Sequence, residues 1–221
     1  MFVGHLAVAL FSKRIAPRLS LGTLVLATML ADFLCFILLI AGVERFALVP
    51  GAAQNRFVGH YIAYSHSLLM DLVWAALFAA AYFWRRRYPR GAWILFAAVL
   101  SHWVLDFVSH RPDMQLAPGS GAVFGLGLWN SLPLTLVAEG GFWLAAAIVY
   151  VRATQTHNRR GVYAFWPATV LLTLAWYKNI TAGIVPDPVK AGISGLVFFS
   201  LTVVWAYWME RVSRAQSVLP A

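Results

Sequence analysis

The stretch GAWILFAAVLSHWVLDFVSH, residues 91–110, indicates how the chain folds, because it joins a membrane-length apolar run to regularly spaced ionisable side chains. The run is long enough to cross the hydrocarbon core of a bilayer as a helix. On that helix His102, Asp106 and His110 recur at every fourth position and lie along one face. Ionisable groups in hydrocarbon are costly and usually mark ion, proton or ligand sites. A histidine and a carboxylate one turn apart can share a divalent cation. The alternative is a hydrogen-bonded pair that holds neighbouring helices together.

The composition is that of a multi-pass membrane protein. Of the 221 residues, 61% are hydrophobic and 11% are charged, and the mean hydropathy is +0.73. Ordinary soluble domains do not have this composition. The net charge of +9 does not require a nucleic-acid partner, because membrane proteins concentrate Lys and Arg in cytoplasmic loops. The single cysteine, Cys35, excludes an internal disulfide and is expected in the core.

The apolar runs predict an all-α, polytopic helical bundle that forms a single transmembrane domain over residues 1–221. A short N-terminal helix and turn occupy residues 1–18, spans that carry the polar residues lie within 20–151, and two further spans lie within 162–209. The six predicted spans are 20–42, 61–84, 91–109, 128–151, 162–178 and 189–209.

The distribution of basic residues predicts the orientation of the bundle. Twelve of the 17 Lys and Arg residues fall on one face: Lys13, Arg14, Arg18, Arg85, Arg86, Arg87, Arg90, Arg152, Arg159, Arg160, Arg211 and Arg214. By the positive-inside rule this face is cytoplasmic, and both ends of the chain start from it. We therefore expect a multi-pass protein of the bacterial cytoplasmic membrane. The outer loops, 43–60 and 110–127, are longer and rich in Pro and Gly, and they are expected to cover a site.

Four carboxylates inside the predicted spans fall at nearly one depth. Counting about 1.5 Å of helical rise per residue from the nearest cytoplasmic arginine, Asp32 and Asp71 lie about 21 Å above the cytoplasmic side. The same arithmetic places Glu139 at about 20 Å and Asp106 at about 24 Å, with His102 at about 18 Å. In a hydrocarbon core of about 30 Å, these side chains form one layer that begins just above the midplane.

The N-terminal helix is expected to add a histidine to this layer. The sequence 16–20, which contains Pro17, is typical of a tight turn. His5 and Asp32 are nearly equidistant from that turn, at 13 residues before and 14 residues after Arg18. A helical hairpin would therefore place His5 at the depth of Asp32, about 20 Å above the cytoplasmic side.

His66 lies at the outer end of its predicted span and is either a ligand or an interfacial histidine. A Ser–His hydrolase built from Ser65 and His66 is disfavoured, because adjacent residues on a helix do not face each other and the chain has no GxSxG turn. Asp71 follows His66 by five residues and lies off that helix face, so its role stays open. His60, in an outer loop, is either solvated or a ligand.

Four short motifs occur in a fixed order: Gly4-His5-Leu6, Leu30-Ala31-Asp32, Ser65-His66-Ser67-Leu68-Leu69, and Ser101-His102 with Asp106. The set resembles the predicted membrane-bound metal-dependent hydrolases. The hallmarks of that family are an early Gly-His, an Asp motif, Thr-His-Ser-Leu and a Ser-His-x-x-x-Asp helix, and it is thought to be distantly similar to zinc-dependent phospholipase C. The resemblance covers about the first half of the chain. It departs at Ala31-Asp32-Phe33-Leu34-Cys35, where the family has Pro-Asp-x-Asp-His.

The resemblance implies a membrane-embedded hydrolase with one or two divalent cations, zinc being the expected metal. Its substrate would be a lipid or a lipid-linked ester or phosphoester near the outer leaflet. The implied ligands are His5, Asp32, His66, His102 and Asp106, with His110 as an outer ligand or the partner of a ligand. Glu139 and Asp71 are the candidate general bases, and Glu139 is also a candidate ligand or proton carrier.

Two other classes of function stay open from the sequence. The same carboxylates would carry protons or ions in a transporter or permease-like protein. A non-catalytic scaffold would instead dock on a membrane-protein partner or form a homo-oligomer. Neither class involves nucleic acid.

Overall fold

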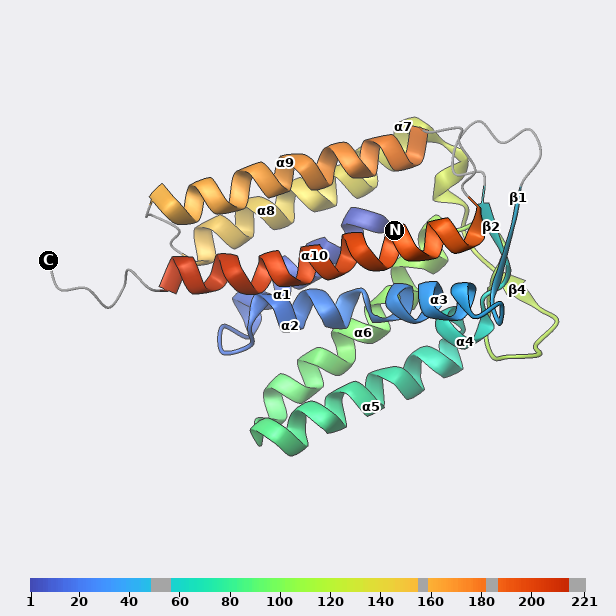
Figure 1. Ribbon diagram of the computed structural model, residues 1–221, viewed down its shortest axis with the longest axis horizontal. Coiled ribbons are helices and arrows are strands. Elements are labelled where there is room, and N and C mark those ends of the chain that lie inside the picture. The colour runs from blue at the N-terminus through green and yellow to red at the C-terminus, as the bar shows by residue number, and fades with distance from the viewer. Residues whose placement is uncertain (49–56, 155–158, 182–186, 215–221) are drawn as a thin grey trace, which may run out of the picture.

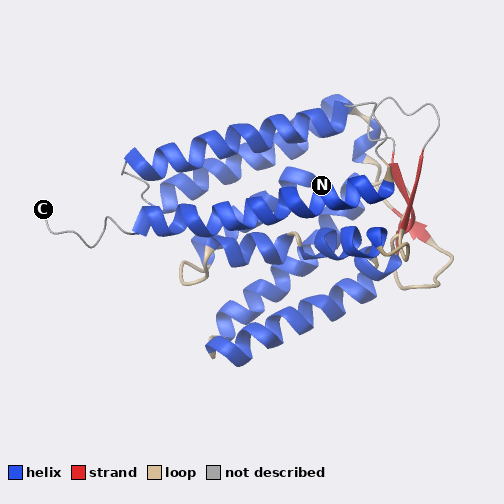
Figure 2. Cartoon of the chain, viewed as in Figure 1, coloured by secondary structure: helices blue, strands red, loops and turns tan. Residues whose placement is uncertain are grey.

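The computed structural model describes residues 1–48, 57–154, 159–181 and 187–214, and it confirms the all-α prediction (Figure 2). The long helices surround a central N-terminal helix (Figure 1). Shorter segments connect them: α4 (Ala63–His66), η1 (Leu128–Asn130), α7 (Leu132–Thr135) and η2 (Leu136–Gly140). The eight longer helices are α1 (Phe2–Ile15), α2 (Leu21–Thr28), α3 (Leu30–Ile40), α5 (Leu68–Arg86), α6 (Pro89–Ser109), α8 (Gly141–Thr154), α9 (Arg159–Thr181) and α10 (Pro188–Arg214).

Two small antiparallel ribbons lie together at one end of the bundle (Figure 2). The first pairs β1 (Arg45–Leu48) with β2 (Phe57–Tyr61), and the second pairs β3 (Met114–Gln115) with β4 (Val123–Phe124). Both ribbons come from the loops that the sequence placed on the outer side. They therefore lie over the same end of α3, α4 and α6.

The described residues contain four or five candidate spans, where the sequence predicted about six. In the described part of the chain, four helical segments are long and apolar enough to cross a membrane: Leu68–Arg86, Pro89–Ser109, Leu132–Thr154 and Pro188–Val212. The pair α2 and α3 makes a fifth if it is counted as one span, although it bends by 55° at Met29. The predicted span 162–178 lies in α9. This helix is long enough to cross a membrane, but it is not apolar enough, because its polar residues and Lys178 lower its mean hydropathy.

The predicted span 61–84 is also interrupted. Its first part contains the end of β2 and the one-turn helix α4, and the continuous helix α5 begins only at Leu68. Ser67 adopts an extended backbone and accepts a hydrogen bond from Met70 N, so it caps α5. His66 therefore lies at a junction between two helices.

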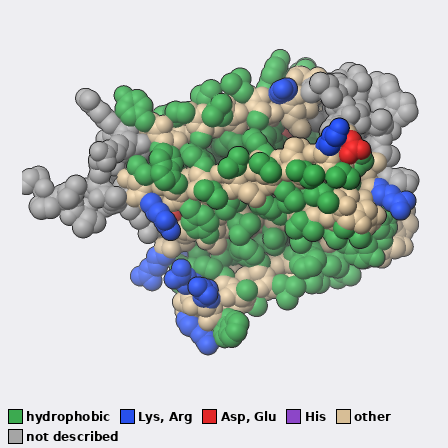
Figure 3. All heavy atoms as spheres, in the orientation of Figure 1, with side chains coloured by type: hydrophobic (Ala, Val, Ile, Leu, Met, Phe, Trp, Pro, Cys, Tyr) green, Lys and Arg blue, Asp and Glu red, His purple; other side chains and the backbone are tan. Residues whose placement is uncertain are grey.

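The short helix α1 lies inside the bundle, where the core is formed. Val3, Leu6, Ala7 and Leu10 are all almost fully buried, and α1 packs on α2, α6 and α8. The outward faces of α5 and α10 instead expose large apolar side chains, which is expected of surfaces that contact lipid. A space-filling view shows this apolar surface, with Lys and Arg gathered at the end where α5 and α6 join (Figure 3).

A buried ion pair joins the turn after α1 to α10. Lys13 Nζ lies 2.5 Å from Glu210 Oε1, and it also donates to the carbonyl oxygens of Pro17 and Leu19. The second carboxylate oxygen of Glu210 accepts from Leu21 N at 2.7 Å. Lys13 is thus a buried residue of α1, although the sequence placed it with the loop cations, and its pair with Glu210 fixes the α1–α2 turn.

Candidate metal centre

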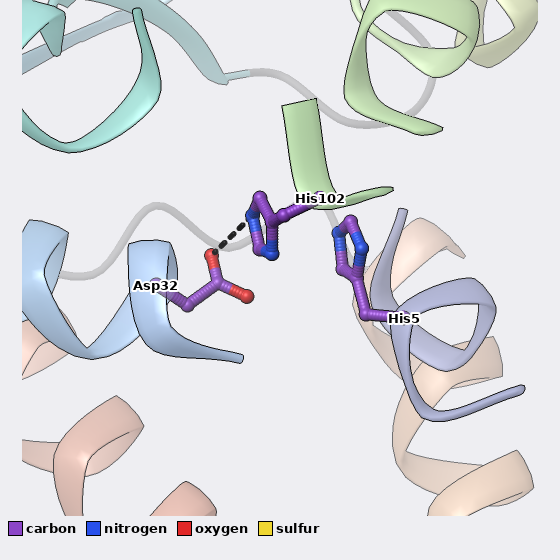
Figure 4. Close-up of side chains that lie close together, drawn as sticks. All are labelled: His5, Asp32 and His102. Carbon is purple, nitrogen blue, oxygen red and sulfur yellow. Dashed lines mark ion pairs between the residues drawn. The ribbon is translucent and has the colours of Figure 1, made fainter. Parts of the chain in front are cut away.

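Five of the predicted ligands come together near the strand end of the bundle. They come from four elements of the fold: His5 from α1, Asp32 from the first turn of α3, His66 from the end of α4, and His102 and Asp106 from α6. Figure 4 shows His5, Asp32 and His102 pointing toward one another from three helices. We refer to these five side chains as the His/Asp cluster.

His102 Nε2 lies at the centre of the His/Asp cluster. It is 3.3 Å from Asp106 Oδ2, 3.3 Å from His66 Nε2 and 3.8 Å from Asp32 Oδ1. His66 Nε2 is 3.6 Å from Asp32 Oδ1 and 3.7 Å from Asp106 Oδ2. Four-coordinate zinc with bonds of about 2.0–2.2 Å separates its ligand atoms by about 3.3–3.6 Å. The observed spacings are close to these values.

His5 completes the cluster from the opposite side. Its Nε2 lies 3.1 Å from Asp106 Oδ1, and its ring stacks on that of His102 with centroids 3.7 Å apart and planes 5° apart. Among the described residues, two groups have potential ligand atoms that all lie within 4.8 Å of one another. One group is His5, Asp32 and His102, and the other is His66, His102 and Asp106. Sharing His102 makes them parts of one site.

The proton of His102 is placed by a backbone carbonyl. His102 Nδ1 lies 2.8 Å from the carbonyl oxygen of Thr28, and a carbonyl oxygen can only accept. Nδ1 therefore carries a proton, and in the neutral imidazole Nε2 presents a lone pair to the cluster. Thr28 is the last residue of α2, next to the bend at Met29. The interruption between α2 and α3 thus places a carbonyl where His102 needs a partner.

His66 contacts its neighbour in the sequence, contrary to our expectation. Ser65 Oγ lies 2.6 Å from His66 Nδ1. Both residues belong to α4, a single turn that ends at His66, before the extended Ser67 (φ −87°, ψ 149°), so the expectation that adjacent helical residues do not meet was wrong here. Ser65 also contacts Glu44, a buried carboxylate that the sequence analysis did not single out.

The cluster is closed on most sides. His5, His66, His102 and Asp106 are all nearly inaccessible, whereas the Asp32 side chain is 23% exposed. The Met1 ammonium group is ion-paired with Asp106 and donates to Ser109 Oγ at 3.2 Å. Access to the cluster is therefore on the side of Asp32.

His110 lies beside the cluster, not within it. It follows the end of α6 in an extended conformation, and its Nε2 is 3.6 Å from Asp106 Oδ2. Its Nδ1 is 3.0 Å from Asp113 Oδ1, and its ring packs on Trp129. His110 belongs to neither of the two three-residue groups, and it contacts Asp106, one of the predicted ligands.

Glu139 and Asp71 both lie next to the cluster and are buried. Glu139 is in η2, a wide helical turn of a kind that often occurs at functional sites. Its Oε1 accepts from Gly4 N at 3.3 Å, and Asp71 Oδ2 accepts from Trp103 N at 3.4 Å. The other carboxylate oxygen of each residue has no hydrogen-bond partner among the described residues. These oxygens can accept from a water molecule or a substrate.

Two further predicted features are peripheral to this site. Cys35 is buried against Ile62 and Met114, as expected of a core residue. His60 belongs to β2, but its side chain lies outside the part of the chain that the structure describes.

The fold and the cluster define a multi-pass helical membrane protein with a buried group of histidines and aspartates inside its bundle. A family model described as YdjM inner membrane protein matches residues 1–184, and the chain belongs to this family. All five residues of the His/Asp cluster lie in the matched region. No curated protein and no solved structure matches the chain. The family description names a membrane location and no activity, so the resemblance to metal-dependent hydrolases stays a prediction.

Proposed function

We propose that this protein is a membrane-embedded metal-dependent hydrolase. The observation that carries the proposal is the convergence of three imidazole nitrogens and two carboxylates on one small volume. The proposed ligands are His5, Asp32, His66, His102 and Asp106, which would hold one or two divalent cations, with zinc as the leading candidate.

The hydrogen-bond chemistry of the cluster supports a cation. With its proton on Nδ1, neutral His102 directs a lone pair at Asp106 Oδ2 and at His66 Nε2, each 3.3 Å away. Acceptor atoms repel one another at this distance unless a proton or a cation lies between them. Imidazole and carboxylate groups at these spacings suit zinc, and a metal would satisfy several acceptors at once.

The partial exposure of the Asp32 side chain favours a reactive site over a purely structural one. Structural zinc sites are closed by four protein ligands, whereas catalytic sites leave one position for water or substrate. A divalent cation in the cluster would supply an activated water at neutral pH and would polarise an ester or phosphoester oxygen. The chain itself would then supply a general base, and the buried carboxylates of Glu139 and Asp71 are the candidates.

The location of the site supports a lipid or lipid-linked substrate. The cluster lies on the strand side of the bundle, and a group of Lys and Arg lies at the opposite end, where α5 and α6 join, although other Lys and Arg lie at the strand end (Figure 3). If the basic end is cytoplasmic, the site lies at the depth of the outer leaflet. An ester or phosphoester of a lipid would reach Asp32 from the bilayer, because apolar residues such as Ile37 are exposed on the same helix.

Elemental analysis of the detergent-purified protein tests the metal. Wild type should hold near-stoichiometric zinc or another divalent metal, and His102→Ala and Asp106→Ala should lose it. Trp93→Ala is a suitable control, because Trp93 lies on the same helix and is 71% exposed. A wild type that holds no metal, even after reloading, would refute the proposal.

A metal-loaded protein should then hydrolyse a member of a panel of lipid esters and phosphoesters. His102→Ala should remove that activity, whereas Trp93→Ala should keep it. Proton- or ion-coupled flux in liposomes without hydrolysis of any lipid would instead favour the transporter alternative. Tolerance of alanine throughout the cluster, together with co-purification of one fixed partner, would favour a scaffold.

A further inference from the structure

We infer that Glu44 is a positioning residue for His66: through the Ser65 hydroxyl it keeps the His66 proton on Nδ1 and so leaves Nε2 free to bind metal. The inference rests on the proposed metal site. It assigns a role to a carboxylate that touches no residue of the His/Asp cluster directly.

Glu44 is buried, and backbone and side-chain donors surround its carboxylate. It follows α3, next to β1, and is 1% exposed. Its Oε1 accepts from Ser65 N at 2.8 Å and from Tyr64 N at 3.0 Å. Its Oε2 accepts from Ser65 Oγ at 2.6 Å. A buried carboxylate is costly unless donors satisfy it, and the Ser65 hydroxyl is among its closest donors.

The direction of each hydrogen bond follows from counting protons. An ionised carboxylate only accepts, and a serine hydroxyl has one proton to donate. Ser65 Oγ donates that proton to Glu44, because a bond to a charged acceptor is stronger than one to a neutral acceptor. The hydroxyl must then accept from His66 Nδ1, 2.6 Å away. Nδ1 therefore carries the proton, and Nε2 carries the lone pair that faces the cluster.

His102 and His66 thus carry their protons on the same ring nitrogen, Nδ1, although different acceptors hold them there. His102 donates from Nδ1 to the Thr28 carbonyl, and His66 donates from Nδ1 to Ser65. The two Nε2 atoms lie 3.3 Å apart, and each directs a lone pair into the space between the two rings. Outer partners of this kind typically change metal affinity by about 10–100-fold when they are removed.

The substitution Glu44→Gln should reverse the chain of hydrogen bonds. The glutamine oxygen can still accept from the Tyr64 and Ser65 amides, which places its NH₂ group against Ser65 Oγ. The hydroxyl would then accept from glutamine and donate to His66 Nδ1. His66 would carry its proton on Nε2, in the position where it blocks a metal.

The test measures zinc affinity and the His66 tautomer in purified full-length protein. Affinity is measured by competition with a chelator, and the tautomer is read from ¹⁵N shifts of histidine-labelled, metal-free protein, assigned with His66→Ala. We expect Glu44→Gln and Ser65→Ala to bind zinc about 10–100-fold more weakly than wild type. In Glu44→Gln the proton of His66 should move to Nε2. Ser65→Thr keeps the hydroxyl and should restore both readouts.

Ser67→Ala is the matched control, because it removes the cap of α5 one residue from His66 and leaves the imidazole contacts intact. Its zinc affinity should equal that of wild type. If Glu44→Gln does not fold, Ser65→Ala tests the inference alone, because it keeps the hydrogen bonds from the Tyr64 and Ser65 amides to Glu44. Wild-type affinity in Ser65→Ala with an unchanged tautomer would overturn the inference and leave the metal site standing. Equal loss in Ser65→Ala and Ser65→Thr would also overturn it. A wild type without zinc binding would refute the proposed function itself.

Discussion

Removing divalent metal with a chelator should lower the thermal stability of this protein, because the proposed ligands come from α1, α3, α4 and α6. Metal that binds only the folded state contributes RT ln(1 + [M]/Kd), which is about 2.7 kcal/mol when free metal is 100 times Kd. In a protein of 221 residues, 1 kcal/mol shifts Tm by about 2–4 °C. Chelation should therefore lower Tm by about 5–11 °C at that metal concentration.

The assay is thermal unfolding in detergent, followed by tryptophan fluorescence over a series of buffered zinc concentrations. Tm should rise steadily with the logarithm of free zinc in wild type and in Trp93→Ala, but not in His102→Ala. Magnesium, which prefers oxygen ligands in octahedral geometry, should have little effect. A wild-type Tm that does not respond to zinc, or an equal response in His102→Ala, would show that the cluster does not bind the metal.

Three further outcomes follow from the described contacts. Glu210→Ala should lower the free energy of unfolding, measured by SDS titration, by about 3–5 kcal/mol, because it removes the carboxylate that neutralises the buried Lys13 ammonium group. The double variant Lys13→Met/Glu210→Leu should lose less, and an equal loss would contradict this account. Glu139→Gln should keep its metal in elemental analysis and lower kcat by about 100-fold or more on the substrate found by the lipid panel; unchanged kcat would exclude Glu139 as the base. Gly22→Ala should lower the free energy of unfolding by about 1–3 kcal/mol, because a Cβ there would overlap the Tyr207 ring. A Tm equal to that of wild type would show that α2 and α10 can move apart without loss of stability.

Four of the five cluster residues could be predicted from the sequence because depth in a membrane follows from counting residues, whereas His66 was implied as a ligand by the family resemblance. Helical rise from the basic loops placed Asp32, His102 and Asp106 in one layer, and the turn at 16–20 added His5. The structure brings these residues together. Such counting works here because apolar helices run roughly along a common direction, so equal chain length from one face gives nearly equal depth.

The supporting residues could not be predicted in this way. Glu44 lies in a predicted outer loop, and its burial depends on contacts with Tyr64 and Ser65, about 20 residues away in the chain. The breaks at Met29 and Ser67 also carry no Pro or Gly that would mark them. Apolar composition predicts where a helix can cross a bilayer, but it does not predict where packing interrupts the helix.

The interruptions themselves are part of how the site is built. Inside a bilayer, irregular backbone is tolerated only where protein or a polar cavity satisfies its hydrogen-bonding groups. The break after α2 places the Thr28 carbonyl against His102, and the end of α4 places Ser65 against His66. The wide turn η2 carries Glu139 beside the backbone of Gly4. Continuous helices would bury the same imidazoles without these partners, so the breaks determine which nitrogen of His102 and His66 faces the cluster.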